Sequence, residues 1–314
     1  MTDSSHKGVA IVLAAHGDRG GDGGNAHLSG HAETLSKQGR FAGVFYGALN
    51  AEPAIENALA EADACGAEQI VVVPLFMSAG YFVKTVLAER VAAAGLETPT
   101  GIMQPIGLDR RIALVMLEHA LRTTKAAKVT PGEARLLVVG HGSKHGSESA
   151  DATKRAARLI GGHSPYASIE TAFIEEEPFL LDVLENYDGT SVIAGFMAGD
   201  GLHSGEDIPD IIKKSGARAL YTGPIGLHPR VPELILSSID RALEEQDSAE
   251  GPVAVAPAKP AGAEKVASRM ASEREAGDAV PEPEPPETEQ PKPAAPVPPE
   301  PKLPEAAGAG METP

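Results

Sequence analysis

The chain has 314 residues, a net charge of −17, 42% hydrophobic residues and one cysteine. Proteins that bind nucleic acid or an anionic membrane surface carry a surplus of Lys and Arg, and the absence of any basic run argues against both partners. A single cysteine excludes a disulfide framework within the chain and a thiolate-rich zinc site.

Neither a membrane span nor a signal peptide is recognisable in the sequence. No apolar run approaches the roughly 20 residues that cross a bilayer, and the start, residues 1–7, is polar and leads directly into a predicted strand. We therefore expect a cytoplasmic protein. Cys65 ends a predicted helix before Gly66, where a free cysteine is expected to be a small buried side chain.

The first part of the chain alternates apolar runs with helical patterns. In chain order the expected elements are a strand over 8–15 ending in His16-Gly17, a helix over about 26–38, a strand over 43–46, a helix after Glu52-Pro53, a strand over 70–77, a further helix, and a fourth strand ending in Pro105-Ile106-Gly107-Leu108. An amphipathic helix closes this part.

The same pattern then occurs a second time. Its elements are a strand over 136–139 ending in Gly140-His141-Gly142-Ser143, a helix over 147–161, a strand over 169–173, a helix after Glu177-Pro178, a strand over 191–197, a further helix, a fourth strand ending in Pro224-Ile225-Gly226-Leu227, and a closing amphipathic helix. The matching text indicates duplication of one domain.

This alternation predicts an α/β protein with two tandem domains, each a four-stranded parallel sheet with helices on both faces. We place the first domain at residues 1–128 and the second at 129–249. Residues 251–314 hold 15 of the 26 prolines and no aromatic residue, so 250–314 is predicted to be a disordered Pro/Glu/Ala-rich tail. Such a tail is also suited to docking an unknown partner.

Three side chains that bind metals are expected to meet in the second domain. Ligands bind beyond the carboxyl ends of parallel strands, and in the strand order 2-1-3-4 the loops after strands 1, 2 and 3 are neighbours. In the second domain these loops carry His141, Glu175 and His203. The alternatives are a structural or phosphate-cradling turn at His141, a surface loop at His203, and solvated helix-start charge within Glu175–Glu177.

The first domain has the same frame without the same ligands. His16 is present, but the position that corresponds to Glu175 is predicted near Gly47, and the one that corresponds to His203 is Phe82. Tyr81 and Phe82 suit either contact with a flat apolar ligand or ordinary loop packing. His27 and His31 are spaced to share one helix face, where a weak surface metal site is an alternative.

These motifs together resemble the class II tetrapyrrole chelatases, which insert cobalt or iron into sirohydrochlorin. The resemblance covers about residues 8–246 and rests on Gly140-His141-Gly142-Ser143, on Glu175 before Glu177-Pro178, on His203 before Glu206-Asp207-Ile208-Pro209, and on the segment 224–230. It implies two tandem chelatase-like, flavodoxin-like domains. Two-domain members usually carry the working histidines in the first domain, whereas here the full set lies in the second.

The resemblance implies a lyase that inserts Co²⁺ or Fe²⁺ into sirohydrochlorin during cobalamin or sirohaem biosynthesis. His141 and His203 would hold the metal as neutral imidazoles, with Glu175 as a third ligand or proton acceptor, and activity should fall below about pH 6. The metal is a substrate, and no permanently bound cofactor is expected. The tetrapyrrole would lie between the domains, and its candidate contacts are Ser143, Lys144, His16, Tyr81, Phe82, Lys84 and Arg230.

Two other functions remain open at this stage. One is a non-catalytic tetrapyrrole or metal carrier that has kept the same binding site. The other is phosphoryl transfer through His141, which ranks low because such enzymes typically place Arg directly before His-Gly, where this chain has Gly140. Two domains in one chain replace a dimer of single domains, which predicts a monomer.

Overall fold

The computed structural model describes residues 5–17, 25–144, 146–199, 201 and 203–248, with only the backbone described for residues 203, 247 and 248. The predicted tail, 250–314, lies outside the described residues. Within the described part, no helix combines the length and apolar character needed to cross a membrane.

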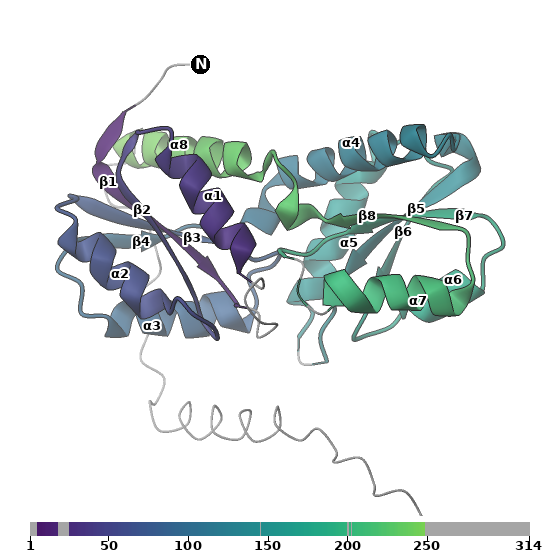
Figure 1. Ribbon diagram of the computed structural model, residues 1–314, viewed down its shortest axis with the longest axis horizontal. Helices are drawn as coiled ribbons and strands as arrows, with labels where there is room; N and C mark the ends of the chain where they lie inside the picture. The colour runs from purple at the N-terminus through teal and green to yellow at the C-terminus, as the bar shows by residue number, and fades with distance from the viewer. Residues whose placement is uncertain (1–4, 18–24, 145, 200, 202, 249–314) are drawn as a thin grey trace, which may run out of the picture. The chain divides into compact units, whose positions relative to one another are not determined.

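Two parallel four-stranded sheets organise the described chain (Figure 1). The first sheet has the order β2-β1-β3-β4, with strands β1 His6–Ala15, β2 Phe41–Ala48, β3 Gln69–Pro74 and β4 Thr100–Ile102. The second has the order β6-β5-β7-β8, with strands β5 Ala134–Gly140, β6 Ser168–Phe173, β7 Thr190–Gly195 and β8 Ala219–Pro224. The predicted fold class and the 2-1-3-4 order are confirmed.

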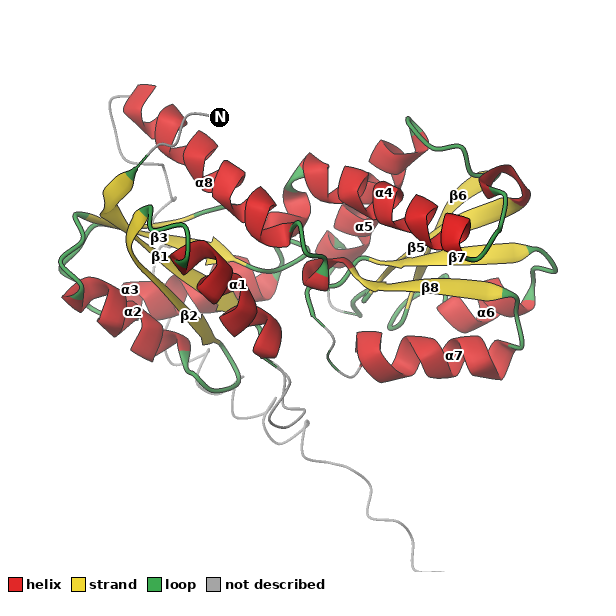
Figure 2. Cartoon of the chain, turned by 45° about the horizontal axis from the view of Figure 1, so that its top comes forward, coloured by secondary structure: helices red, strands yellow, loops and turns green. Residues whose placement is uncertain are grey.

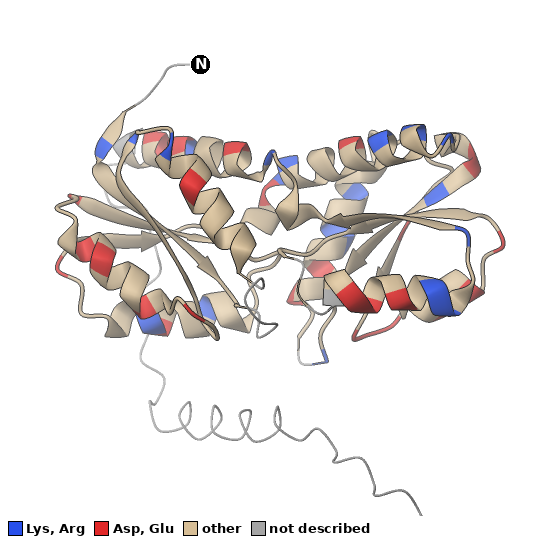
Figure 3. Cartoon of the chain, in the orientation of Figure 1, with Lys and Arg blue, Asp and Glu red and all other residues tan. Residues whose placement is uncertain are grey.

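The central strands are apolar because both of their faces are covered. Residues 10–15 of β1 and all seven residues of β5 are buried. The covering helices are α1 Ala26–Ser36, α2 Ile55–Ala64, α3 Ala88–Ala93, α4 Arg110–Ala126, α5 Glu148–Gly161, α6 Leu180–Glu185, α7 Ile208–Ser215 and α8 Val231–Ser248. Charged residues lie mainly on these helices and on loops (Figure 3), as expected for strands buried on both faces.

The two long helices α4 and α8 are exchanged between the sheets. Helix α4 follows the strands of the first sheet but packs against α5, β7 and β8, whereas α8 follows the second sheet and packs against α1 (Figures 1 and 2). Hydrogen bonds agree: His119 of α4 binds the Thr222 carbonyl at 3.0 Å, and Arg40 of the first half binds Asp240 of α8.

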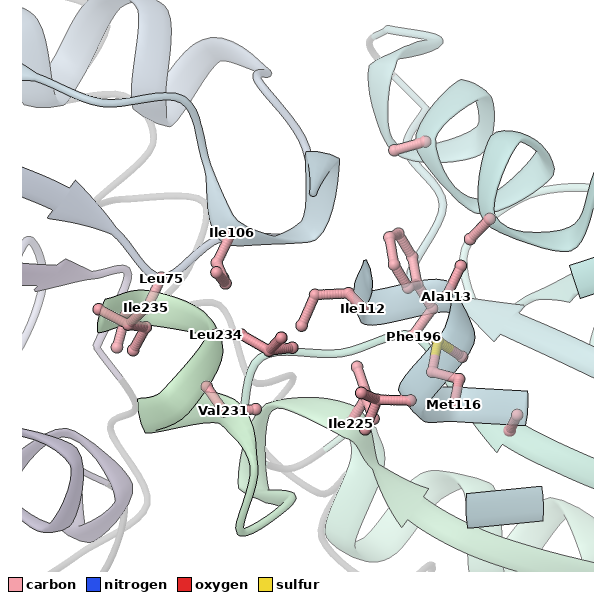
Figure 4. Close-up of a cluster of buried hydrophobic side chains, with 14 of the residues drawn as sticks. Leu75, Ile106, Ile112, Ala113, Met116, Phe196, Ile225, Val231, Leu234 and Ile235 are labelled. Carbon is pink, nitrogen blue, oxygen red and sulfur yellow. The ribbon is translucent and has the colours of Figure 1, made fainter. Parts of the chain in front are cut away.

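The exchange produces one continuous core that spans both sheets. Figure 4 shows Ile235 of α8 near Leu75 of the first half, and Ala113 of α4 near Phe196 of the second half. Two further clusters, under α2 and under α6–α7, cover the opposite faces. The predicted boundaries at 1–128 and 129–249 therefore follow the sequence repeat, while the packing combines segments from both repeats. The third predicted part, 250–314, is the tail.

Cys65 is not the buried side chain that its sequence context predicts. The residue caps the end of α2 next to Gly66, which adopts φ +79°, so its place at the helix end is as expected. Its side chain is exposed to solvent, as are its neighbours Ala64 and Gly66 at the end of the helix.

Candidate functional site

His141 and Glu175 meet at the carboxyl edge of the second sheet. Gly140, the last residue of β5, pairs with Phe173, the last residue of β6, and the chain then continues into both loops. The backbone N–H groups of Ile174 and Glu175 donate to the His141 carbonyl at 3.2 and 2.9 Å. This double contact joins the two loops, as the strand order predicts for adjacent strand ends.

The turn after β5 sets the orientation of the His141 ring. Nδ1 lies 3.0 Å from the Gly142 carbonyl, which can only accept a hydrogen bond. The proton of the neutral ring is therefore on Nδ1, and the lone pair is on Nε2, the tautomer suited to metal binding. Gly142 has φ +81°, and a Cβ there would lie 2.9 Å from Cγ of Glu176, so this turn requires glycine.

The neighbouring glutamates Glu175 and Glu176 have different surroundings. Glu175 has its Oε2 3.2 Å from Nζ of Lys144, at the exposed rim. Glu176 accepts a hydrogen bond from the Ser143 N–H at 2.9 Å, and Ser149 Oγ accepts from the Gly142 N–H at 3.2 Å. The N–H groups that would cradle a phosphate are thus already bonded, which disfavours the phosphate-binding alternative.

The side chain of His203 lies outside the described residues. Its backbone begins a π-helical turn, His203–Asp207, that leads into α7. Ser204, only 3% exposed, donates its hydroxyl to the carbonyls of Gly199 and Gly201, and Tyr221 Oη donates to the Ser204 carbonyl at 3.0 Å. Burial raises the pKa of Tyr221, so its hydroxyl stays protonated as a donor.

The first sheet has an equivalent rim, by which we mean the loops that follow the carboxyl ends of the strands. The Asn50 N–H donates to the His16 carbonyl at 2.9 Å, just as the Glu175 N–H donates to His141. Asn50, and not Gly47, is therefore the counterpart of Glu175. The prediction of Gly47 is wrong, because the chain runs two residues past the end of β2 before it reaches the His16 carbonyl. The equal spacing of the two His-to-rim pairs in the sequence was the signal that could have identified Asn50.

At this rim the three equivalent side chains are in contact. Asn50 Nδ2 lies 3.2 Å from His16 Nε2, and the rings of His16 and Phe82 meet edge to face with centroids 4.4 Å apart. Phe82 starts the π-helical turn Phe82–Leu87, as His203 starts His203–Asp207. The hydrogen bonds of Lys84 N to Gly80 O and of Gly205 N to Gly201 O, each 2.9 Å, show the same local geometry.

The candidate substrate contacts are distributed around these rims. Tyr81 and Phe82 are large aromatic side chains with 38% and 37% exposure, and their rings meet edge to face with centroids 5.7 Å apart. Lys84 of the first half reaches Glu148 of the second at 3.3 Å. Arg230 is held by Glu118 of α4 at 2.6 Å and by Glu233 of α8, so its charge is already matched by two carboxylates.

The pair His27 and His31 does not form a surface metal site. His31 is only 7% exposed, and its Nε2 lies 2.9 Å from the Gly226 carbonyl. Burial lowers the pKa of His31, so its imidazole is neutral. The carbonyl accepts only, so Nε2 carries the proton and is not available as a ligand.

The candidate metal site at His141 and Glu175 does not coincide with a cavity, and no cluster of metal-binding side chains marks it among the described residues. A cavity of about 640 Å³ lies between α5, β6 and α6, lined by residues including Lys154, Arg158 and Glu170, and does not include His141. The described residues contain no group of three His, Cys, Asp or Glu side chains that could hold a metal, and His203 is not among those side chains.

The chain is similar to proteins of known family over most of its described length. A family model described as CbiX matches residues 10–123 and 135–242, which includes both rims. A probable sirohydrochlorin cobaltochelatase of Halobacterium salinarum is 25% identical over 264 residues, covering 72% of this chain and 89% of that protein.

Solved structures show the same two-sheet fold. The structure of CbiX, the terminal enzyme for biosynthesis of siroheme in denitrifying bacteria, has a TM-score of 0.61 and 26% identity, covering 74% of this chain and 99% of that one. SirB from Bacillus subtilis with Fe³⁺ has a TM-score of 0.64 and 22% identity, covering 76% and 98%. At 22% identity the second likeness shows the fold alone.

Proposed function

Since the chain belongs to the CbiX family, we propose that it is a chelatase that inserts a divalent metal ion, Co²⁺ or Fe²⁺, into sirohydrochlorin, in cobalamin or sirohaem biosynthesis. The reaction is that of a lyase forming nitrogen–metal bonds: the metal enters the macrocycle and two pyrrole protons leave. The observation that carries the proposal is the pairing of His141 with Glu175 at the carboxyl edge of the second sheet.

The metal would bind at the rim of the second sheet. His141 supplies the Nε2 lone pair, because its Nδ1 proton is donated to the Gly142 carbonyl. His203 would supply a second imidazole, and Glu175 a carboxylate that is either the third ligand or the acceptor of a pyrrole proton; imidazole and carboxylate both suit Co²⁺ and Fe²⁺. The contact between Phe82 and His16 supports this set, since Phe82 is the counterpart of His203.

The macrocycle would contact both rims. Its flat face would lie against Tyr81 and Phe82, whose exposed rings offer apolar contact. The carboxylates of the macrocycle would pair with Lys84 and Lys144, and would replace Glu148 and Glu175 as the partners of these two lysines. Ser143 and His16 would contact the macrocycle at the same place. Arg230 remains a candidate for the same role, although its present partners are Glu118 and Glu233.

The test is anaerobic incubation with sirohydrochlorin and Co²⁺, Fe²⁺ or Ni²⁺ in turn, followed by absorbance. We expect insertion faster than the spontaneous rate with Co²⁺ or Fe²⁺, and at least a 100-fold loss in His141→Ala and in His203→Ala, since each would remove a metal ligand. His163→Ala, an exposed histidine of the same half beyond the far end of α5, is the matched control and should keep full activity.

Retained insertion in His203→Ala would refute the ligand assignment. Saturable tetrapyrrole or metal binding without acceleration by the wild type would instead identify a carrier. A cytoplasmic location and a monomeric state remain predictions of the sequence, to be checked by fractionation and by light scattering.

A further inference from the structure

Helix α1 of the first half contacts the segment of the second half that leads to His203. His31 lies on this helix, and its Nε2 donates to the Gly226 carbonyl, which is 195 residues away in the sequence. The Gly226 N–H in turn donates to the Met197 carbonyl at 2.9 Å. A Cβ on Gly226 would lie 1.8 Å from the Ala198 carbonyl oxygen, so the two backbones touch.

The next residues of this segment are held just as closely. A Cβ on Gly199 would lie 2.8 Å from Cε1 of His27, so the His27 ring rests directly on that backbone. The Gly199 carbonyl accepts the Ser204 hydroxyl. His27 therefore contacts Gly199 directly, while His31 binds Gly226, which is itself hydrogen-bonded to the Met197 carbonyl.

Comparison of the two repeats shows that these histidines occur on α1 but not on α5, its counterpart in the second half. The spacing that separates His16 from His141 also separates His31 from Ala156 and His27 from Ala152. Both alanines are buried on α5, the helix of the second half that corresponds to α1. A purely structural requirement of the fold would apply to both helices. Histidine occurs only on the helix that faces the loop with the third proposed metal ligand.

We propose that His31 is a positioning residue of the chelatase: through Gly226 it fixes the backbone of Met197 and Ala198, on the part of the chain that leads to His203, so that His203 reaches the metal held by His141. The inference rests on the proposed function. Burial keeps the His31 ring neutral, so its single Nε2 proton is committed to the Gly226 carbonyl. Metal ligands must be held close to their productive geometry by such supporting hydrogen bonds.

The experiment compares His31→Leu, His31→Gln and His119→Leu in the full chain. Leucine fills the site without a donor, whereas glutamine restores an N–H near the place of Nε2. His119→Leu is the matched control, because it removes another histidine-to-carbonyl hydrogen bond between the halves, to Thr222 at 3.0 Å, that does not involve Gly226 or its contacts with Met197 and Ala198. Titration with Co²⁺ gives the metal affinity, and insertion into sirohydrochlorin gives kcat and KM.

We expect His31→Leu to raise the Kd for Co²⁺ about tenfold and to lower kcat similarly, the scale seen for groups that support metal ligands, with the KM for sirohydrochlorin within about twofold. His31→Gln should recover most of both. His119→Leu should lower the thermal midpoint as much as His31→Leu while leaving the Kd for Co²⁺ unchanged. If His31→Leu does not fold, His31→Asn, whose shorter amide cannot reach Gly226, takes its place.

Wild-type Co²⁺ affinity in a folded His31→Leu, or equal losses of affinity in His31→Leu and His119→Leu, would overturn the positioning role and leave the chelatase assignment intact. Failure of the wild type itself to insert any metal would overturn the proposed function, and this inference with it.

Discussion

Two side chains distinguish the rims of the two sheets. Asn50 stands in the first half where Glu175 stands in the second, and Phe82 stands where His203 stands. The Asn50 amide donates towards the His16 Nε2 lone pair at 3.2 Å, and the Phe82 ring lies against the same imidazole. An amide donor and a phenyl ring cannot replace a carboxylate and an imidazole as ligands, so the first rim is suited to contact the macrocycle and not the metal.

The backbone geometry shared by the rims leads to a gain-of-function prediction. The double substitution Asn50→Glu with Phe82→His should create a second set of two imidazoles and a carboxylate. Titration of the purified protein with Co²⁺ should then give two bound ions per chain in place of one. Each single variant should still bind one ion.

A folded double variant that binds only one Co²⁺ would show that side-chain identity is not what separates the rims. The His141→Ala background provides the control, because there the double variant should bind a single ion, at the first rim.

At the level of elements, the start of α4 is a junction between the two exchanged helices. Asp109 caps α4 by accepting the Arg111 N–H at 2.9 Å, and it also accepts from the Arg111 guanidinium and from Ser238 and Arg241 of α8. Burial alone would raise the pKa of Asp109, but the hydrogen bonds from Arg111 and Ser238 hold it well below its usual range. One carboxylate thus links both long helices.

The sign of the pH dependence follows from this depressed pKa. The unfolded chain takes up the proton first as pH falls, so the Asp109 contribution is complete above about pH 5 and decreases progressively as the pH falls below about 4 towards the depressed folded-state pKa. Asp109→Asn should lower the free energy of unfolding by about 2 kcal/mol at pH 7, the scale of hydrogen bonds to charged groups. Urea unfolding should show this difference shrinking below pH 4.

Asp63→Asn is the comparison for this variant. Asp63 is an exposed carboxylate that accepts from Thr98 N and Glu97 N within the first half, so its loss should cost less. An Asp109→Asn penalty that is small at pH 7, or that does not change with pH, would contradict the junction role.

At the scale of the whole molecule, the exchange of α4 and α8 makes the two sheets depend on each other. Ile235 of α8 is fully buried in the core cluster that also includes residues of both sheets. Ile235→Ala should cost about 2–5 kcal/mol, the range for large-to-small core substitutions. Amide hydrogen exchange should show loss of protection in β1 and in β5 together, because neither sheet keeps this face covered alone.

Leu114→Ala, at a position of α4 that is 40% exposed, should leave exchange in both sheets close to wild type. Separate unfolding of the two sheets in Ile235→Ala would show that each half is an independent folding unit, as the sequence repeat by itself would suggest.

The local pattern of residues was sufficient to predict most of the fold. Apolar runs of strand length between helical patterns require parallel sheets covered on both faces, and duplication of the pattern requires two of them. The strand order also predicts that His141 and Glu175 lie at one rim, since they follow the neighbouring strands β5 and β6. These features depend on short stretches of chain and on the handedness of their connections.

Only the tertiary structure decided which sheet each long helix covers and that His31 reaches Gly226. An amphipathic helix such as α4 has one apolar face that would fit either sheet, and its sequence carries no information on which one it meets. Contacts between residues that are far apart in the chain depend on how separate elements pack. Only the folded chain determines that packing, because burying the apolar faces of all the elements together selects one arrangement.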